Sequence, residues 1–377
     1  MKKTSTTSMI LLLLLLSLCS CKPNGDTPDL CHSELDQQAL FQNLADQLII
    51  PRYMDFQHAV ANLLGQTEIF SASPNLAMLH SLQNAFKTAY VSWQYVAQYE
   101  FGPAEDLNIR NLVNHFPADV ALIQANIEAG KTSFSQAEAF DRGLPALDYL
   151  LFGLGGDDAE ILAKYVNGTP QKTYYLEYLR HLVIDIETNI NAVVNQWTNA
   201  NDAYRENFIA NTGTAAGSAL SLLINGLNEH YEMIRRDKIG IPVGALTLGF
   251  PNPDKVEAPY AGISAELALT ATQAAKELYL GQGKDGINRE GLDDYLQQIS
   301  EKEEGLALHQ NIKQQFDLAI AALTGLADPL SGTIISEQAK VESAYAEIVK
   351  QVVNIKTDMP SLLCIAITYV DNPSDSD

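Results

Sequence analysis

The chain has 377 residues, of which 46% are hydrophobic and 19% are charged, and its 46 acidic and 24 basic residues give a formal net charge of −22. This composition excludes an intrinsically disordered chain, which combines low hydrophobicity with a high fraction of charge. The acidic excess argues against nucleic acid as a partner, because phosphate backbones are bound by clusters of Lys and Arg. At roughly 150 residues per domain, the length predicts about two globular units.

The N-terminus has the order of a secretory signal. Lys2 and Lys3 precede an apolar run over residues 9–16, and small residues and cysteines follow it. The run is shorter than the roughly 20 apolar residues of a membrane-spanning helix. It ends in Leu-Cys-Ser-Cys, which resembles a bacterial lipobox, with Cys21 as the lipidated residue; an ordinary cleaved signal is the alternative.

These features predict a lipoprotein signal peptide over residues 1–20 and a flexible tether over residues 21–33, which contain Pro, Gly and Asp. We expect a lipid anchor to hold the protein to a membrane of the bacterial cell envelope, in particular the outer membrane. After lipidation, Cys31 and Cys364 remain; they either form a disulfide between the two ends of the chain or stay unlinked, and both alternatives are open.

Helical periodicity dominates the rest of the chain. Apolar residues recur at spacings of three and four in several stripes, of which the clearest are Leu79, Leu82, Phe86, Ala89, Trp93 and Val96, and Leu179, Val183, Ile186, Ile190, Val193 and Trp197. Clusters of Gly and Pro interrupt the stripes, so packed helical bundles are favoured over a coiled coil. The sequence predicts an all-α fold of two bundle units.

The longest interruption, residues 240–259, is rich in Gly and Pro and could join two helical units or cover a cleft. We therefore expect a first helical bundle with its extension over residues 34–240 and a second bundle with a closing segment over residues 241–372. Residues 362–370 are β-branched and predict a terminal strand or extended stretch. An acidic tail, residues 373–377, follows.

Few residues suggest chemistry. The sequence contains no HExxH, CxxC, P-loop or GxSxG motif, so zinc-peptidase, nucleotide and triad chemistry have no motif to support them. Glu229, His230 and Glu232 could supply part of a metal site, but a solvated helix surface or an intrahelical ion pair is favoured, because one helix segment supplies too few ligands. The basic residues that follow, including Arg236 and Lys238, suit the C-terminal end of a helix dipole.

The most distinctive stretch is residues 140–153 (FDRGLPALDYLLFG). Pro145 is compatible with the first turn of a helix that begins near Gly143, because the N–H that proline lacks would be unpaired there. Asp148 then lies in the second turn. It is either a functional carboxylate or a polar position beside a mostly buried helix.

Several separated stretches resemble the imelysin family of bacterial envelope proteins, which are described as metallopeptidases and iron-regulated proteins. They occur in the family's order and cover nearly all of residues 35–372; they are residues 82–93 (LQNAFKTAYVSW), 101–103 (FGP), 111–128 (NLVNHFPADVALIQANIE), 236–244 (RDKIGIPVG) and 357–371 (TDMPSLLCIAITYVD). The resemblance implies two packed four-helix-bundle-like units with a site near their junction.

The family's proposed metal motif is GxHxxE, and the matching residues here are 143–148 (GLPALD). Pro145 stands where the family has its His, and Asp148 stands where it has its Glu, so the chain resembles a subgroup that lacks the His. Asp148 is a hard oxygen donor suited to Ca²⁺, Mg²⁺ or Fe³⁺, but one carboxylate does not make a metal site.

The leading hypothesis is a non-catalytic lipoprotein that binds iron or another ligand in bacterial iron uptake and that works with an iron-uptake receptor or another envelope partner. No cofactor is assigned beyond iron or another divalent or trivalent cation. The predicted ligand-binding residues lie at the junction of the bundles, and no catalytic residue is assigned; they are Arg142, Asp148, Tyr149, Arg236, Asp237 and Lys238.

Two other classes stay open. One is a metallopeptidase with a metal site rebuilt from Asp148, Glu229, His230 and Glu232, which requires these side chains to converge. The other is an envelope scaffold or partner-binding lipoprotein without a small-molecule site.

Overall fold

The computed structural model describes residues 35–131, 133–134, 139–166, 170–199, 203–299 and 302–369. The expectations for the signal peptide, Cys21, the tether, Cys31 and the acidic tail lie outside these residues. The described chain is helical and contains no β-strand, which confirms the predicted all-α fold. Within these ranges, no helix has the length and apolar character needed to span a bilayer.

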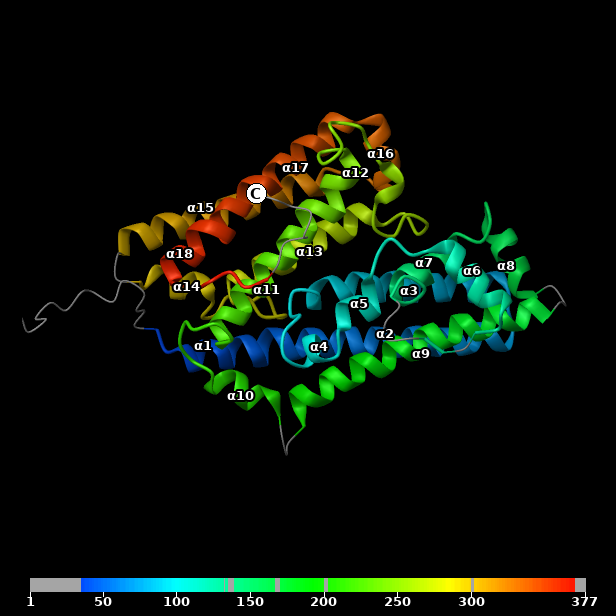
Figure 1. Ribbon diagram of the computed structural model, residues 1–377, viewed down its shortest axis with the longest axis horizontal. Helices are drawn as coiled ribbons and strands as arrows, with labels where there is room; N and C mark the ends of the chain where they lie inside the picture. The colour runs from blue at the N-terminus through cyan, green and yellow to red at the C-terminus, as the bar shows by residue number, and fades with distance from the viewer. Residues whose placement is uncertain are drawn as a thin grey trace, which may run out of the picture.

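The first bundle is built around three long helices, α2 (Ile50–Ala72), α3 (Leu76–Val96) and α9 (Pro170–Thr198), with the shorter α7 (Gly143–Phe152) packed on α3 and α9 (Figure 1). Asn75 caps α3, because its side chain accepts the N–H of Met78. The predicted apolar stripe of α3 is buried along its whole length. Before α2, α1 (Gln37–Asn43) continues through a π-helical segment, Leu44–Ile49.

The second bundle contains α11 (Ala219–Met233), α13 (Ser264–Tyr279), α15 (Lys302–Thr324) and α17 (Gln338–Val352). α11 continues without a break through a π-helical segment, Ile234–Gly240, into α12 (Ile241–Val243), and the chain turns at Gly244, where φ is +92°. The expected boundary at residues 240 and 241 therefore falls inside a continuous helical path. Because α11 packs on α13 and α17, the helices of the second bundle begin at α11.

Shorter elements complete the fold: α4 (Pro103–Asp106), α5 (Ile109–Asn114), α6 (Val120–Glu128), α8 (Asp158–Val166), α10 (Tyr204–Ala210), a 3₁₀ turn (Pro253–Lys255), α14 (Leu292–Gln297), α16 (Leu330–Ser336), a π-helical segment (Val353–Asp358) and α18 (Met359–Leu363). Residues 362 and 363 belong to α18, so the expected extended stretch begins later: residues 364–369, the terminal segment, run without helix or strand. Its first residue, Cys364, is disulfide-bonded.

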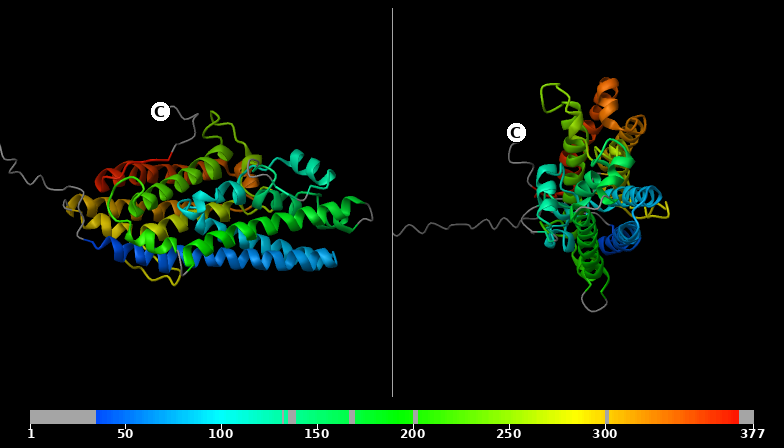
Figure 2. Two further views of the ribbon diagram at one scale, coloured as in Figure 1. Left: turned by 60° about the horizontal axis from the view of Figure 1, so that its bottom comes forward. Right: turned by 90° about the vertical axis from the view of Figure 1, so that its right-hand side faces the viewer.

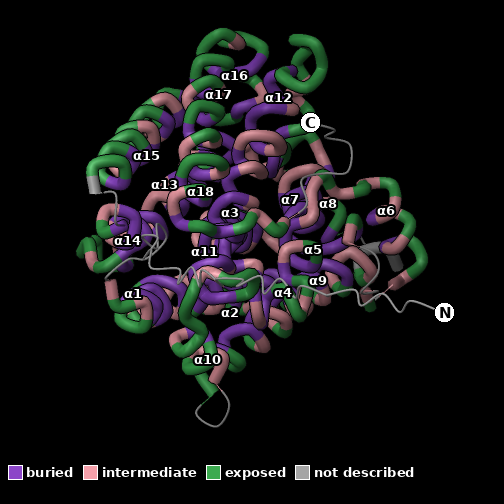
Figure 3. The backbone as a smooth tube through the Cα atoms, turned by 60° about the vertical axis from the view of Figure 1, so that its left-hand side comes forward, coloured by how far each residue is buried: buried purple, intermediate pink, exposed green. Residues whose placement is uncertain are grey.

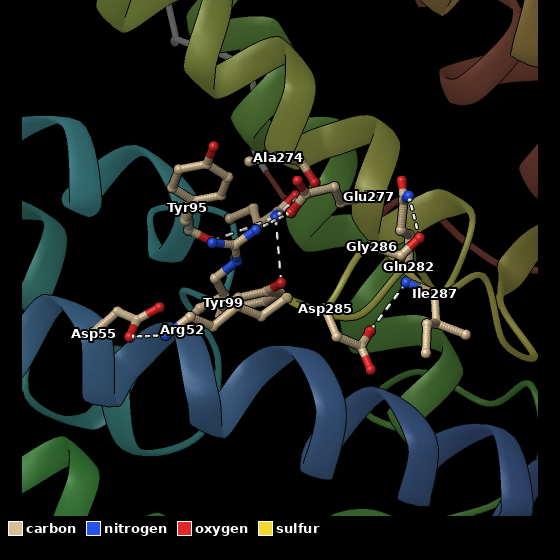
Figure 4. Close-up of polar contacts among 12 residues, drawn as sticks. Arg52, Asp55, Tyr95, Tyr99, Ala274, Glu277, Gln282, Asp285, Gly286 and Ile287 are labelled. Atoms are coloured by element: carbon tan, nitrogen blue, oxygen red, sulfur yellow. Dashed lines mark hydrogen bonds and ion pairs between the residues drawn. The ribbon is translucent and has the colours of Figure 1, made fainter.

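The long helices of both bundles lie roughly along the long axis of the molecule, and their buried faces point inward (Figures 2 and 3). One hydrophobic cluster extends through both bundles, and α3 packs against α13 where they meet. Polar contacts cross this interface too. Arg52 on α2 pairs with Glu277 on α13 at 2.5 Å and lies over the ring of Tyr95 at 3.8 Å, as Figure 4 shows. The two bundles therefore share a core and form one packed unit.

Candidate functional site

The helix α7 carries the residues 143–148 that align with the family motif, and its position is set by close backbone packing. Gly143 has φ +74°, and a Cβ atom there would lie 2.4 Å from the backbone oxygen of Val113. Only glycine fits both the left-handed conformation and this contact with α5. Pro145 occupies the first turn, where its missing N–H costs no helical hydrogen bond, as predicted.

Asp148 is fully buried and faces the segment that connects α12 to α13. Its Oδ1 accepts the N–H of Ala261 at 2.7 Å, and its Oδ2 accepts the N–H of Tyr260 at 3.1 Å. Burial raises the pKa of its carboxyl group to about 7, with a further contribution from Glu257, while the two backbone N–H groups act in the opposite direction. Both oxygens of Asp148 therefore already bind backbone donors.

A pocket of about 220 Å³ lies between α7, the start of α6 and the segment that follows α12. Most of its lining residues are apolar, but Asp148, Asp254 and Lys255 line it too; six of the lining residues are Phe116, Pro117, Pro145, Asp148, Val256 and Tyr260. We call this the seam pocket. Pro145 and Asp148 share it, so the residues aligned with the family motif do lie at the junction of the bundles.

A buried polar network lies beside the seam pocket. The ammonium group of Lys238 donates to the carboxylate of Glu257 and, at 2.8 Å, to the amide oxygen of Gln94. Asn114 donates to the second carboxylate oxygen of Glu257 at 2.8 Å and accepts the hydroxyl of Tyr90 at 2.7 Å. Both bundles contribute, since Tyr90 and Gln94 lie on α3. Lys238 thus supplies a fixed positive charge inside the seam.

The other predicted ligand-binding residues have mixed positions. Tyr149 accepts a hydrogen bond from Gln124 at 2.6 Å, and its ring packs against Tyr260, with centroids 5.4 Å apart. Arg142 is buried and its guanidinium group donates to Asp185 on α9, so it pairs within the first bundle. The prediction that Arg142 binds a ligand finds no support in this arrangement.

Arg236 and Asp237 form an ion pair between adjacent residues at 3.1 Å, and both are partly exposed. Burial raises the pKa of Asp237, while Arg236 and Lys238 lower it. Of Arg236, Asp237 and Lys238, it is Lys238 that contacts the buried network at the seam, through Gln94 and Glu257.

The candidate metal ligands are not brought together. Glu229 pairs with Arg110 at 2.6 Å, and Glu232 pairs with Arg235 and Lys356. His230 is buried between α11 and α13, where burial and the nearby cations Lys238 and Arg110 lower its pKa to about 3. Each side chain serves a different contact, because consecutive helical positions point about 100° apart. No group of three His, Cys, Asp or Glu side chains in the described part of the chain could hold a metal ion.

Glu257 and Tyr260 are the functional-site residues that sequence reasoning missed. Glu257 lies in the Gly- and Pro-rich interruption that we expected to join two units or cover a cleft, and Tyr260 directly follows it; that expectation was the available signal. Nothing in the spacing of Glu257 indicates burial, because it belongs to no apolar stripe.

The fold and this junction define a class: an all-helical protein of two packed bundles, with a small pocket and a buried polar network where they meet. The family model for imelysin, peptidase family M75, matches residues 49–357. The chain therefore belongs to the imelysin family.

Individual relatives agree with this assignment. The chain is 23% identical over 313 residues to iron-regulated protein A of Synechococcus elongatus, a match that covers 81% of this chain and 80% of that protein. The crystal structure of an iron-regulated protein A precursor from Parabacteroides distasonis is similar with a TM-score of 0.73 and 19% identity, and covers 88% of this chain and 96% of that one. An imelysin-like protein from Psychrobacter arcticum gives a TM-score of 0.66 and 16% identity, over 89% and 97% of the chains.

The residues at the seam do not fit the metal ion that the family motif implies. Proline has no ligating side chain, and both oxygens of Asp148 accept backbone N–H groups. The nearby carboxylate of Glu257 is already paired with an ammonium group. A structural or catalytic metal site needs three or four converging ligands, which these residues do not provide.

Proposed function

We propose that the protein is a non-catalytic, ligand-binding lipoprotein of the bacterial cell envelope that serves iron uptake. The observation that carries the non-catalytic part is the chemistry of the motif: Pro145 offers no ligand, and the oxygens of Asp148 are held by Tyr260 and Ala261. Membership of the imelysin family and similarity to proteins named as iron-regulated support the link to iron.

The seam pocket is the ligand site in this proposal. Its volume of about 220 Å³ is below the range of about 300–1,000 Å³ that is usual for drug-sized ligands, so it suits a compact group or one end of a larger molecule. The apolar walls would contact the body of that group, and Asp148 at the base would orient it. A rebuilt metallopeptidase is less well supported, because its four required side chains take part in separate contacts.

The pocket's role is tested by filling it. Ala118 lines the seam pocket and is partly exposed, so Ala118→Trp places a large ring at the pocket; because Ala118 also packs against the core, circular dichroism must show that the variant folds. Ala77→Trp adds the same ring at an exposed position of α3 and is the matched control. In a strain that lacks the gene and is grown with limiting iron, the wild type and Ala77→Trp should restore growth, whereas Ala118→Trp should not.

Three results would contradict this proposal in different ways. If deletion of the gene leaves growth with limiting iron unchanged, the link to iron uptake is wrong. If Ala118→Trp restores growth fully, the seam pocket is not the ligand site. Peptide hydrolysis by the purified chain that requires added Zn²⁺ and disappears in Asp148→Asn would refute the non-catalytic assignment.

The lipid anchor has its own test. Cells labelled with a radioactive fatty acid should incorporate the label into the wild-type chain but not into Cys21→Ala, whereas Cys19→Ala should keep it, because bulky Leu18 precedes Cys19. Equal labelling of the wild type and Cys21→Ala would show that Cys21 is not the anchor.

A further inference from the structure

A second, larger cavity lies where α4 and α5 of the first bundle face α11 and the terminal segment. It has a volume of about 490 Å³, and no residue lines both this cavity and the seam pocket. We call it the α5–α11 cavity. The lining residues that the argument uses are Glu100, Phe101, Glu105, Arg110, Leu222 and Glu229.

The wall formed by α11 depends on a close helix approach. Leu222, Gly226 and Glu229 line the cavity from one face of this helix, at spacings of four and three residues. Gly226 lets the helix approach the first bundle, because a Cβ atom there would lie 2.5 Å from the backbone oxygen of Gln98. The cavity is therefore framed by backbone packing between the two bundles.

The side chain of Asn225 holds the terminal segment against this wall. It donates to the backbone oxygen of Ala366 at 3.1 Å and accepts the N–H of Thr368 at 2.7 Å. The side chain therefore pairs with the backbone in the way that the backbone of a neighbouring β-strand does. Thr368 and Tyr369 then line the cavity. Secondary-structure elements far apart in the sequence thus enclose a single site.

More negative than positive side chains face the cavity. Three carboxylates line it, from Glu100, Glu105 and Glu229, and Arg110 is the one guanidinium group among its lining residues. Arg110 pairs with Glu229 at 2.6 Å, whereas the carboxylate of Glu100 accepts the backbone N–H of Arg110 at 3.0 and 3.2 Å. No cation among the described residues forms an ion pair with Glu105, which is exposed at the rim. Arg110 therefore serves both Glu229 and Glu100, and the three carboxylates exceed the one guanidinium group by two negative charges.

The size and arrangement of the site exclude a directly coordinated metal ion as the fitting ligand. The volume lies in the range of about 300–1,000 Å³ that accommodates small organic molecules. Within the described ranges, no three acidic or imidazole side chains are close enough to coordinate one ion. Phe101 and Leu222 offer apolar contact for a carbon skeleton between the charged groups.

We propose that the α5–α11 cavity binds a small organic dication of the aliphatic diamine class. One ammonium group lies against Glu100 and the other against Glu105, and the aliphatic chain contacts Phe101 and Leu222. This site is independent of the seam pocket and does not depend on the proposed role in iron uptake.

The test uses the full chain and isothermal titration calorimetry with putrescine. We expect one saturable site, and no binding of butane-1,4-diol, which has the same carbon skeleton without the charges. Glu105→Gln and Glu100→Gln should each weaken putrescine binding by roughly tenfold, as expected for the loss of a charge-assisted hydrogen bond. Glu105 is exposed, so its variant should fold normally, which circular dichroism would confirm.

Matched controls separate a site from general attraction to an acidic protein. Glu342→Gln removes an exposed carboxylate on α17 and should leave the affinity unchanged. The proposal is overturned if Glu342→Gln weakens binding as much as Glu105→Gln, or if Mg²⁺ displaces putrescine at equal concentration. It is also overturned if no saturable binding occurs up to about 10 mM putrescine.

Discussion

Lys238 and Glu257 form an ion pair that is almost completely buried at the junction of the two bundles, with relative exposures of 4% and 1%. Lys238 lies in the helical path that begins with α11, and Glu257 lies in the segment that leads to α13. The charges are satisfied by further contacts with Gln94 and Asn114. The pair therefore fixes the connecting segment, and with it Tyr260 and Ala261, against α7.

Breaking this pair should destabilise the fold strongly. Lys238→Met leaves the carboxylate of Glu257 buried without a counter-charge, so we expect a loss of about 3–5 kcal/mol in the free energy of unfolding. Urea denaturation measures this loss. Lys350→Met is the control, because its pair with Glu347 is at the surface and should contribute less than about 1 kcal/mol. If both variants lose the same small amount of free energy of unfolding, the pair at the seam stabilises the fold no more than a surface pair does.

The double variant Lys238→Met with Glu257→Gln should recover part of the lost stability, since it removes the unpaired charge while the amide can still bond with Asn114. A double variant as unstable as Lys238→Met alone would mean that lost packing around the lysine stem, rather than the unpaired buried charge of Glu257, causes the effect.

A second prediction concerns Gly143 at the start of α7. Gly143→Ala combines a left-handed backbone with a Cβ atom 2.4 Å from the oxygen of Val113, so it should cost more than about 2 kcal/mol. Gly213→Ala shares the positive φ, at +100°, but has open space around it and should cost about 1 kcal/mol. Thermal unfolding of the two variants gives the comparison, and equal costs would show that the contact with Val113 is easily relieved.

The sequence predicted the helices better than it predicted the contacts at the junction of the two bundles. Buried residues such as Leu82, Phe86 and Trp93 recur at helical spacing, and this local pattern determines which face of α3 enters the core. The pairing of Lys238 with Glu257 follows from how the chain folds back after α12, which no local pattern encodes. Arg142 shows the same limit, because its partner Asp185 lies on α9 and only packing brings the two together.

The position of the bundle division was hard to predict for a related reason. Gly240 and Pro242 are usual helix breakers, yet the helical path continues through both. Gly240 lies where a Cβ atom would meet the backbone oxygen of Arg235 at 2.5 Å, inside a π-helical segment, and Pro242 begins a new helical turn. The residue types glycine and proline alone could not distinguish a continuous helical path from a linker between two bundles.

A third prediction follows from the raised pKa of Asp148, which is about 7. Because the folded protein holds this proton more tightly than the unfolded chain, the group favours folding most below its unfolded pKa of about 4. This contribution is lost as the pH rises from about 4 to about 7. The free energy of unfolding of Asp148→Asn should therefore fall less than that of the wild type as the pH rises over this interval.

Urea denaturation at about pH 4.5 and about pH 7.5 tests this difference. Burial also raises the pKa values of Glu100 and Asp293 to about 7, so the variant should reduce the pH dependence without abolishing it. Asp254→Asn removes an exposed carboxylate at the rim of the same pocket and should keep the wild-type dependence. An unchanged slope in Asp148→Asn would show that Asp148 titrates alike in both states.

The last prediction links protonation to the α5–α11 cavity. Burial raises the pKa of Glu100 to about 7; Glu105 and Glu229 raise it further, and the charge and backbone N–H of Arg110 lower it. The hydroxyl of Tyr53 also faces Glu100, but its own pKa is raised well above the ordinary value, so it stays neutral. Glu100 therefore changes charge near neutral pH, where both amines of putrescine stay protonated because their pKa values lie near that of Lys, about 10.

Putrescine affinity should consequently rise between about pH 6 and about pH 8, as Glu100 becomes ionised and its carboxylate attracts an ammonium group. Titrations in buffers with different ionisation enthalpies should show protons released on binding at about pH 7. Glu100→Gln should bind more weakly and with little pH dependence, whereas Glu105→Gln should keep the rise because Glu100 is still present. A rise of equal size in Glu100→Gln would assign the titration to another group and remove Glu100 from the site.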